Sequence, residues 1–315
     1  MKLIYMASTN NKLRLGEFLL ENLYLGGNHI SKICLGESII YESGTSEPDE
    51  PVIPEVPKIN IDDYVTFEAL EDNFTISLSR NACEYCIDGV DEWFSLSSGT
   101  TTQSINNGQT ISIRASITPT SNYGVGTFTL GKKCNVRGNV MALLFGDEGK
   151  NNNSLSGKNY AFQKLFQNAS NLMDVSENFL PATTLSTYCY EYAFDGCSSL
   201  TTAPSLPSTT LQQYCYRYMF RNCSSLTTAP ILPAVTLTNY CYQYMFYNCS
   251  KLNYIKAMFT TDPGSRNSSN QARYTYNWVS GVASSGTFVK NSSATWNRTG
   301  AHAVPSGWTI QTASS

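Results

Sequence analysis

Hydrophobic and aromatic residues recur at a fixed interval of 26 residues between residues 180 and 257. The Leu-Pro pair at 180–181 returns at 206–207 and 232–233, and the Tyr-Cys-Tyr triplet at 188–190 returns at 214–216 and 240–242. Three further columns each hold one residue type: Phe194, Phe220 and Phe246; Cys197, Cys223 and Cys249; Leu200, Leu226 and Leu252. This period predicts copies that stack and share one core.

Within one copy, the spacing of apolar residues assigns the faces. We interpret residues 185–197 as a short irregular helix, in which about 100° per residue places Tyr188 and Tyr192 on the outer side. The core side then carries Cys189, Tyr190, Ala193, Phe194 and Cys197. A strand should follow, burying Leu200, Ala203 and Ser205, then Leu226, Ala229 and Ile231, then Leu252, Ile255 and Ala257. Its other face should expose Thr202, Pro204, Thr228, Pro230, Tyr254 and Lys256.

The rest of the chain divides into flanking segments. Residues 1–42 predict short β segments, and residues 43–58 form a linker with Pro48, Pro51, Pro54 and Pro57 at every third position. That period fits a stiff polyproline II spacer, and a disordered acidic linker is an equally good interpretation. Residues 59–148 predict an immunoglobulin-like β-sandwich, with strands near 66–70, 74–78, 83–87, 110–117 and 126–130 and a turn at Asp88-Gly89. Residues 149–257 hold the repeats, and residues 258–315 predict a β-rich cap containing Trp278, Phe288, Trp296 and Trp308.

The repeat resembles a known family. Residues 219–226, Met-Phe-Arg-Asn-Cys-Ser-Ser-Leu, and their two copies are similar to the BspA-type leucine-rich repeat, as found in proteins of gut Bacteroidales and of their tailed phages. A weaker copy upstream matches at Tyr160, Phe162, Phe166 and Leu172, with Ala169 in place of the cysteine, and is interpreted as a capping repeat. The expected fold is mainly β with short helices: a β-sandwich, then a short leucine-rich-repeat solenoid with a β-rich C-terminal cap.

Composition narrows the function. Charged residues make up 14% of the chain, the net charge is −3, and no basic patch indicates nucleic acid. The longest apolar run, residues 140–145, is too short for membrane insertion. The N-terminus lacks the apolar core of a secretion signal, which favours a virion protein assembled in the host cytoplasm over an exported one.

Candidate chemistry is sparse. The cysteine columns are expected to be small buried thiols, and Cys83 and Cys86 lack the second pair that a metal site needs. His29 and His302 have no nucleophile motif nearby, and the repeats hold two acids, Glu191 and Asp195. The acidic stretches 88–92 and 147–149 are expected to be solvated turns. We therefore expect that the protein is not an enzyme and that it has no catalytic residues, metal or cofactor.

The combined expectation is a phage virion structural protein, a head or tail fibre or decoration protein, that displays its repeats to the host. Other virion proteins would bind residues 1–42, and we expect a homo-oligomer, with a trimer as one option. The ligand would be a host surface glycan or protein. Candidate binding residues form two aromatic rows, Tyr188, Tyr214 and Tyr240 beside Tyr192, Tyr218 and Tyr244, although packing alone also explains them. The alternatives are a bacterial cell-surface adhesin with leucine-rich repeats and, less favoured, a polysaccharide-degrading enzyme.

Overall fold

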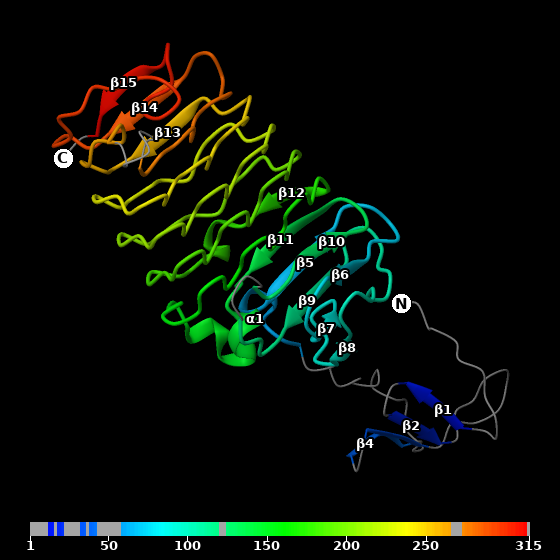
Figure 1. Ribbon diagram of the computed structural model, residues 1–315. Helices are drawn as coiled ribbons and strands as arrows, with labels where there is room; N and C mark the ends of the chain where they lie inside the picture. Colours follow the sequence, from blue (N-terminus) through cyan, green and yellow to red (C-terminus); the bar gives the residue numbers. More distant parts are fainter. Residues whose placement is uncertain are drawn as a thin grey trace. The chain divides into compact units, whose positions relative to one another are not determined.

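The computed structural model describes residues 58–119, 124–265 and 273–313, together with the backbones of four strands in the first 42 residues (Figure 1). The described chain is mainly β with a few short helices, which confirms the coarse fold class. It divides into two compact units, residues 1–57 and 58–315. Each is treated by itself below.

The described strands of the first unit form an antiparallel sheet. Its strands are β1 (Lys12–Leu15), β2 (Phe18–Glu21), β3 (Lys32–Leu35) and β4 (Ser38–Glu42), and they pair in sequence order. The prediction of short β segments in residues 1–42 is thus confirmed for these four strands. The predicted polyproline spacer, residues 43–58, lies outside the described residues apart from Lys58.

The second unit begins with two sheets. Their strands are β5 (Val65–Ala69), β6 (Ile76–Leu78), β7 (Cys83–Ile87), β8 (Phe94–Leu96), β9 (Thr110–Arg114), β10 (Phe128–Leu130), β11 (Cys134–Gly138) and β12 (Leu172–Val175). One sheet has the order β12-β11-β5-β9-β7-β8, and β10 pairs with β6 in the other. The expected turn is confirmed, since Asp88 and Gly89 both have positive φ and the Val90 amide donates to the Ile87 carbonyl.

The first of the stacked copies is joined to these sheets. Strand β12, which lies in the upstream copy, pairs in parallel with β11. The Phe128 ring lies 5.1 Å from the Phe67 ring and 5.6 Å from the Phe166 ring, measured between centroids. One continuous apolar core therefore crosses residue 148, where a segment boundary was expected.

The helices among the described residues are short. They are α1 (Ala142–Phe145) and three 3-10 turns, η1 (Ile61–Asp63), η2 (Gly146–Asn151) and η3 (Glu177–Phe179). None of the helices in the described part of the chain has the length and apolar character needed to cross a bilayer.

The helix predicted over residues 185–197 is wrong, because this segment is a series of tight turns. The amides of residues 189, 191, 193, 195 and 197 donate to the carbonyl three residues back. The alternate amides donate to the next copy instead, as Tyr190 does to Cys215 and Phe194 to Met219, at 3.0 and 2.9 Å. Every fourth residue, Tyr188, Tyr192 and Gly196, has positive φ. The resulting period of four residues resembles the 3.6 of a helix closely enough that the predicted faces are still correct.

The copies lie side by side along the chain (Figure 1), and their core consists of aromatic columns. Centroid distances are 5.6, 5.8 and 6.0 Å along Phe162, Tyr190, Tyr216 and Tyr242, and 5.5, 5.4 and 5.8 Å along Phe166, Phe194, Phe220 and Phe246. These rings are at most 1% exposed. The predicted core side of each copy is therefore confirmed.

The alternation predicted for the following strand is partly wrong. Pro204 and Pro230 are buried, whereas Ser205 is partly exposed and Ile231 is 52% exposed. Proline has no amide hydrogen for a ladder, so these segments make isolated bridges such as Thr228–Tyr254 and lose the regular alternation. In the last copy, which lacks the proline, strand β13 (Tyr254–Ala257) buries Ile255 and Ala257 as predicted.

The C-terminal segment continues the stack. Strands β13, β14 (Thr287–Lys290) and β15 (Thr309–Thr312) form a parallel sheet. The amides of Tyr242, Tyr244 and Phe246 donate to the carbonyls of residues 274, 276 and 278, so residues 273–281 form one more turn-rich coil. The Trp278 indole is buried against the Tyr242 and Phe246 rings, at the end of both core columns.

Candidate functional site

Two rows of tyrosines run along the outer side of the turn segments. The first row continues upstream to Tyr160, and its successive ring centroids (Tyr160, Tyr188, Tyr214, Tyr240) are 4.8, 4.4 and 4.9 Å apart. The second row (Tyr192, Tyr218, Tyr244) has spacings of 4.5 and 4.8 Å. Neighbouring rings are parallel within 8°. All six predicted residues therefore lie together, and we call the two rows the tyrosine face.

The backbone places these rings by an unusual conformation. All six predicted tyrosines have φ between 55° and 60°, in the left-handed region that costs L-residues about 1–2 kcal/mol each. A third left-handed position follows four residues after the second row of tyrosines. It holds Gly196, Asn222 and Asn248, residue types that tolerate this conformation. That column of Gly and Asn was the sequence signal for the turns, and the helical interpretation missed it.

The ring faces are covered by neighbouring rings within each row, so the outward groups are ring edges and phenol hydroxyls. The hydroxyls of Tyr188, Tyr192, Tyr214 and Tyr218 make no hydrogen bond within the described residues and are not sealed in the interior. Burial and the neighbouring Tyr214 raise the pKa of Tyr188 to about 12, and burial and Tyr218 raise that of Tyr192 to about 12. Both phenols are therefore neutral donors and acceptors at physiological pH.

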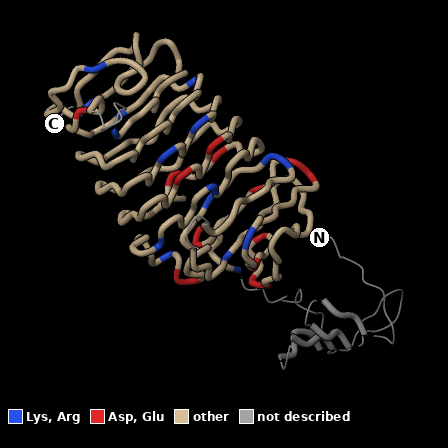
Figure 2. The backbone as a smooth tube through the Cα atoms, in the orientation of Figure 1, with Lys and Arg blue, Asp and Glu red and all other residues tan. Residues whose placement is uncertain are grey.

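Charged residues are sparse along the stacked copies (Figure 2), and two ion pairs lie beside the tyrosine rows. Arg217 approaches rings of both rows, whereas Arg221 approaches rings of the second row only. Glu191 and Asp195 are each only 2% exposed, and each pairs with the arginine of the same column in the next copy. Arg217 binds Glu191, while Nε and Nη2 of Arg221 each lie 2.8 Å from an oxygen of Asp195. The two guanidinium groups also lie over ring faces, Arg217 at 4.6 Å from the Tyr214 centroid and Arg221 at 4.9 Å from that of Tyr218.

This arrangement determines what the face offers to a ligand. Both carboxylates lie beneath the surface, where the guanidinium groups and the side chains of Gln163 and Gln167 satisfy them. The arginine side chains remain 26% and 32% exposed. The outer surface therefore presents phenol hydroxyls that repeat with the copies, together with two partly exposed guanidinium groups.

The cysteine columns lie in the core behind this face. Every cysteine whose side chain the structure describes is buried and unpaired. The thiols of Cys197, Cys223 and Cys249 donate to the Phe166, Phe194 and Phe220 carbonyls at 3.0–3.1 Å. Burial raises the pKa of Cys249 to about 12, which keeps this thiol protonated.

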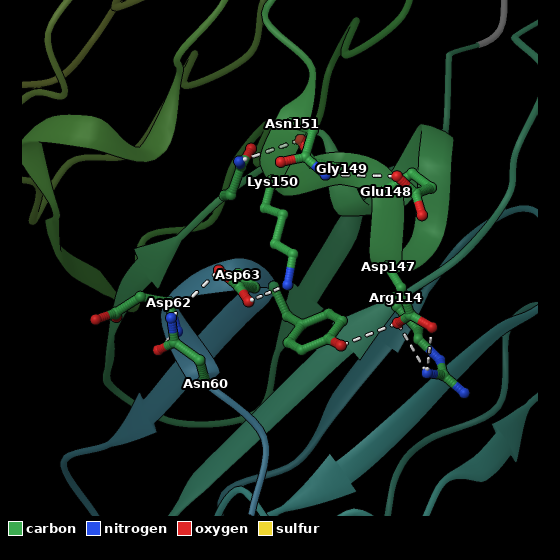
Figure 3. Close-up of polar contacts among 11 residues, drawn as sticks. Asn60, Asp62, Asp63, Arg114, Asp147, Glu148, Gly149, Lys150 and Asn151 are labelled. Atoms are coloured by element: carbon green, nitrogen blue, oxygen red, sulfur yellow. Dashed lines mark hydrogen bonds and ion pairs between the residues drawn. The ribbon is translucent and has the colours of Figure 1, made fainter.

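The acidic residues of the β-rich part are engaged in polar contacts (Figure 3). Asp147 accepts hydrogen bonds from the Tyr64 phenol and the Arg114 guanidinium, both at 2.9 Å, and Lys150 reaches Asp63 at 3.2 Å. In the acidic stretch at residues 88–92, the Asp88 carboxylate accepts a hydrogen bond from the Thr110 amide at 2.8 Å. Among the described residues, no group of three or more histidine, cysteine or acidic side chains is arranged to bind a metal ion.

Comparison of the chain with models of protein families finds no match, and neither curated proteins nor solved structures yield one. The candidate site therefore stands on its geometry alone. Sequence reasoning identified the six tyrosines and missed Arg217 and Arg221, although each shares a repeat column with the acid that it binds.

Proposed function

We propose that this chain is a phage virion structural protein that displays a leucine-rich-repeat solenoid and binds a host surface glycan through the tyrosine face. The β-rich part at 58–148 would be the sandwich domain that precedes the solenoid. The small sheet of β1–β4, in a compact unit of its own, would bind other virion proteins. The observation that carries the proposal is the pair of hydroxyl rows with two partly exposed guanidinium groups beside them.

The geometry favours one mode of binding. Sugar rings usually bind tyrosine by stacking on the face of its ring. Here the tyrosine rings stack on one another, with centroids 4.4–4.9 Å apart, so those faces are covered. The hydroxyls instead repeat at the interval of the copies. A polymer of sugar units presents hydroxyls at regular intervals too, so several weak hydrogen bonds act together and give useful avidity.

The test removes hydroxyls while preserving the stacks. We expect the double variant Tyr214→Phe/Tyr218→Phe to bind surface polysaccharide of a Bacteroidales host about tenfold more weakly than the unmodified chain, with an unchanged melting temperature. Tyr216→Phe is the matched control, because its ring lies in the buried column at 1% exposure. Wild-type binding by the double variant would show that the rows only pack.

The virion assignment has a separate test. Mass spectrometry of purified virions should find the chain at stoichiometric copy number, and a chain without residues 1–42 should fold but fail to join the particle. Normal incorporation of the shortened chain would place the anchor elsewhere. Detection only on bacterial cell surfaces would favour the adhesin alternative.

A further inference from the structure

A polar cavity of about 770 Å³ opens at the upstream end of the tyrosine face. It lies where the end of β6, the approach to β10 and the first stacked copy meet. Lys164 and Gln163 of the first copy line it, and Arg80, Asn81 and Thr118 line it from the β-rich part. None of its described lining residues is acidic. Its size is that of a site for a small ligand or one end of a polymer.

The wall of this cavity is built from fixed contacts. The Asn81 side chain donates to the Val125 carbonyl at 3.0 Å, and the Val125 amide donates to Ala161 in the first copy at 3.0 Å. A Cβ at Gly124 would lie 2.4 Å from the Tyr160 carbonyl oxygen, so that only glycine permits this approach. The strands and the first copy are thus held together at the cavity, so the described walls named here are in place before a ligand binds.

The cavity adjoins the tyrosine face through Lys164. Lys164 has φ of 61° and occupies the column of Tyr192, Tyr218 and Tyr244, so it stands at the head of the second row. Its amide donates to the Glu191 carbonyl at 2.9 Å. Gln163 bridges the cavity to the arginines, because it donates at 2.6 Å to the Glu191 carboxylate that also binds Arg217. A polymer lying along the face would therefore reach the cavity with its end.

The charges at this end select the ligand. The Lys164 side chain is exposed, and no described carboxylate lies within ion-pair distance of its ammonium group. Arg80 also lines the cavity, but it is engaged in an interaction of its own, so Lys164 carries the preference for an anion. Hydroxyl and amide groups make up the rest of the named lining, which suits sugar hydroxyls. Bases of single-stranded nucleic acid would need free aromatic faces, which the stacked rows do not offer.

We propose that this cavity is an anion subsite that gives the tyrosine face a preference for acidic polysaccharide, with Lys164 binding the carboxylate of a uronic acid. The inference rests on the proposed glycan-binding function and specifies its ligand class. A carboxylate beside Lys164 forms a charge-assisted hydrogen bond, and the hydroxyl rows hold the following sugars.

The experiment uses the full chain and matched polymers. The probes are polygalacturonate and alginate, the methyl ester of polygalacturonate as the neutral form of the same backbone, and poly(dT) as a non-sugar polyanion. We expect the chain to bind the two uronic polymers about tenfold more tightly than the ester, and Lys164→Gln to remove this preference. Lys251→Gln changes the net charge equally at an exposed position in the last copy and should leave binding unchanged. Raising the salt from about 0.1 M to about 1 M should weaken binding of the acidic polymers, since the screening length falls from about 10 Å to about 3 Å.

The outcomes separate the two proposals. Equal binding of polygalacturonate and its ester, or an equal loss in Lys164→Gln and Lys251→Gln, would overturn the anion subsite. So would binding of poly(dT) as tight as that of the uronic polymers, or binding to none of the probes. The glycan-binding function is judged independently by host polysaccharide and the Tyr214→Phe/Tyr218→Phe variant.

Discussion

The three tyrosines of each complete copy have different environments although they lie within five residues of one another. Tyr188 and Tyr192 are half-buried with outward hydroxyls, whereas Tyr190 is 1% exposed. The four-residue period of the turns explains this difference, since Tyr188 and Tyr192 occupy its outer position and Tyr190 occupies a core position. Burial also raises the pKa of Tyr190 well above that of a free tyrosine.

The Tyr190 hydroxyl is buried and has no hydrogen-bond partner among the described residues. Such a group costs free energy, and Phe162 already fills the same column one copy earlier. We therefore expect Tyr190→Phe to raise the free energy of unfolding by about 1 kcal/mol, measured by urea denaturation. A destabilised variant would mean that the hydroxyl is satisfied in solution.

At the scale of the element, the turn segment gains its hydrogen bonds from the next copy. Its left-handed positions are imposed by stacking, because tyrosine has no preference for them. Glycine normally weakens regular structure relative to alanine, by about 1 kcal/mol. At Tyr218, with φ of 58°, we expect the reverse order: Tyr218→Gly should be about 1 kcal/mol more stable than Tyr218→Ala. Thermal melts of the two variants compare them directly, and an ordinary position such as Thr201 supplies the control pair.

The ion pairs of Glu191 with Arg217 and of Asp195 with Arg221 each connect one copy to the next. Removing Arg217 leaves the Glu191 carboxylate buried with only Gln163 as a side-chain partner, whereas removing Glu191 leaves an arginine that is 26% exposed to water. We expect Arg217→Met to cost about 3 kcal/mol or more, and Glu191→Gln to cost clearly less. Urea denaturation of both variants measures this asymmetry. Equal losses would indicate that water reaches Glu191 in the folded protein.

At the scale of the whole molecule, the buried thiols make the fold sensitive to alkali. Burial raises the pKa of Cys189, Cys241 and Cys249 to about 12 from a usual value of 9.0. The unfolded chain loses these thiol protons above about pH 9, while the folded chain keeps them. The contribution of the buried thiols to the free energy of unfolding is therefore fully present below pH 9 and falls as the pH rises towards 12.

Urea midpoints at about pH 8 and about pH 11 should show this loss. Cys249→Ala removes one thiol and should make the pH dependence shallower, and Ala169 already occupies that column in the first copy. A midpoint that does not change with pH would contradict the thiol burial described here.

Much of the organisation follows from the sequence alone. The period of 26 residues determines which residues share a column, and hence the tyrosine rows, the aromatic core and the cysteine columns. Residues in one column must be neighbours whatever the local backbone, because each copy stacks on the next. The pairing of Glu191 with Arg217 was accessible by the same reasoning.

The tertiary structure decided what periodicity leaves open. A four-residue turn repeat and a helix bury nearly the same positions, so apolar spacing does not distinguish them; the amides that bond to the next copy do. The exposure of Ile231 depends on prolines that interrupt the ladder. The coil at 273–281 has a different spacing from the others, and the cavity beside Lys164 joins segments from residue 79 to residue 164. Contacts between segments so distant in the chain form only on folding, so the local sequence does not predict them.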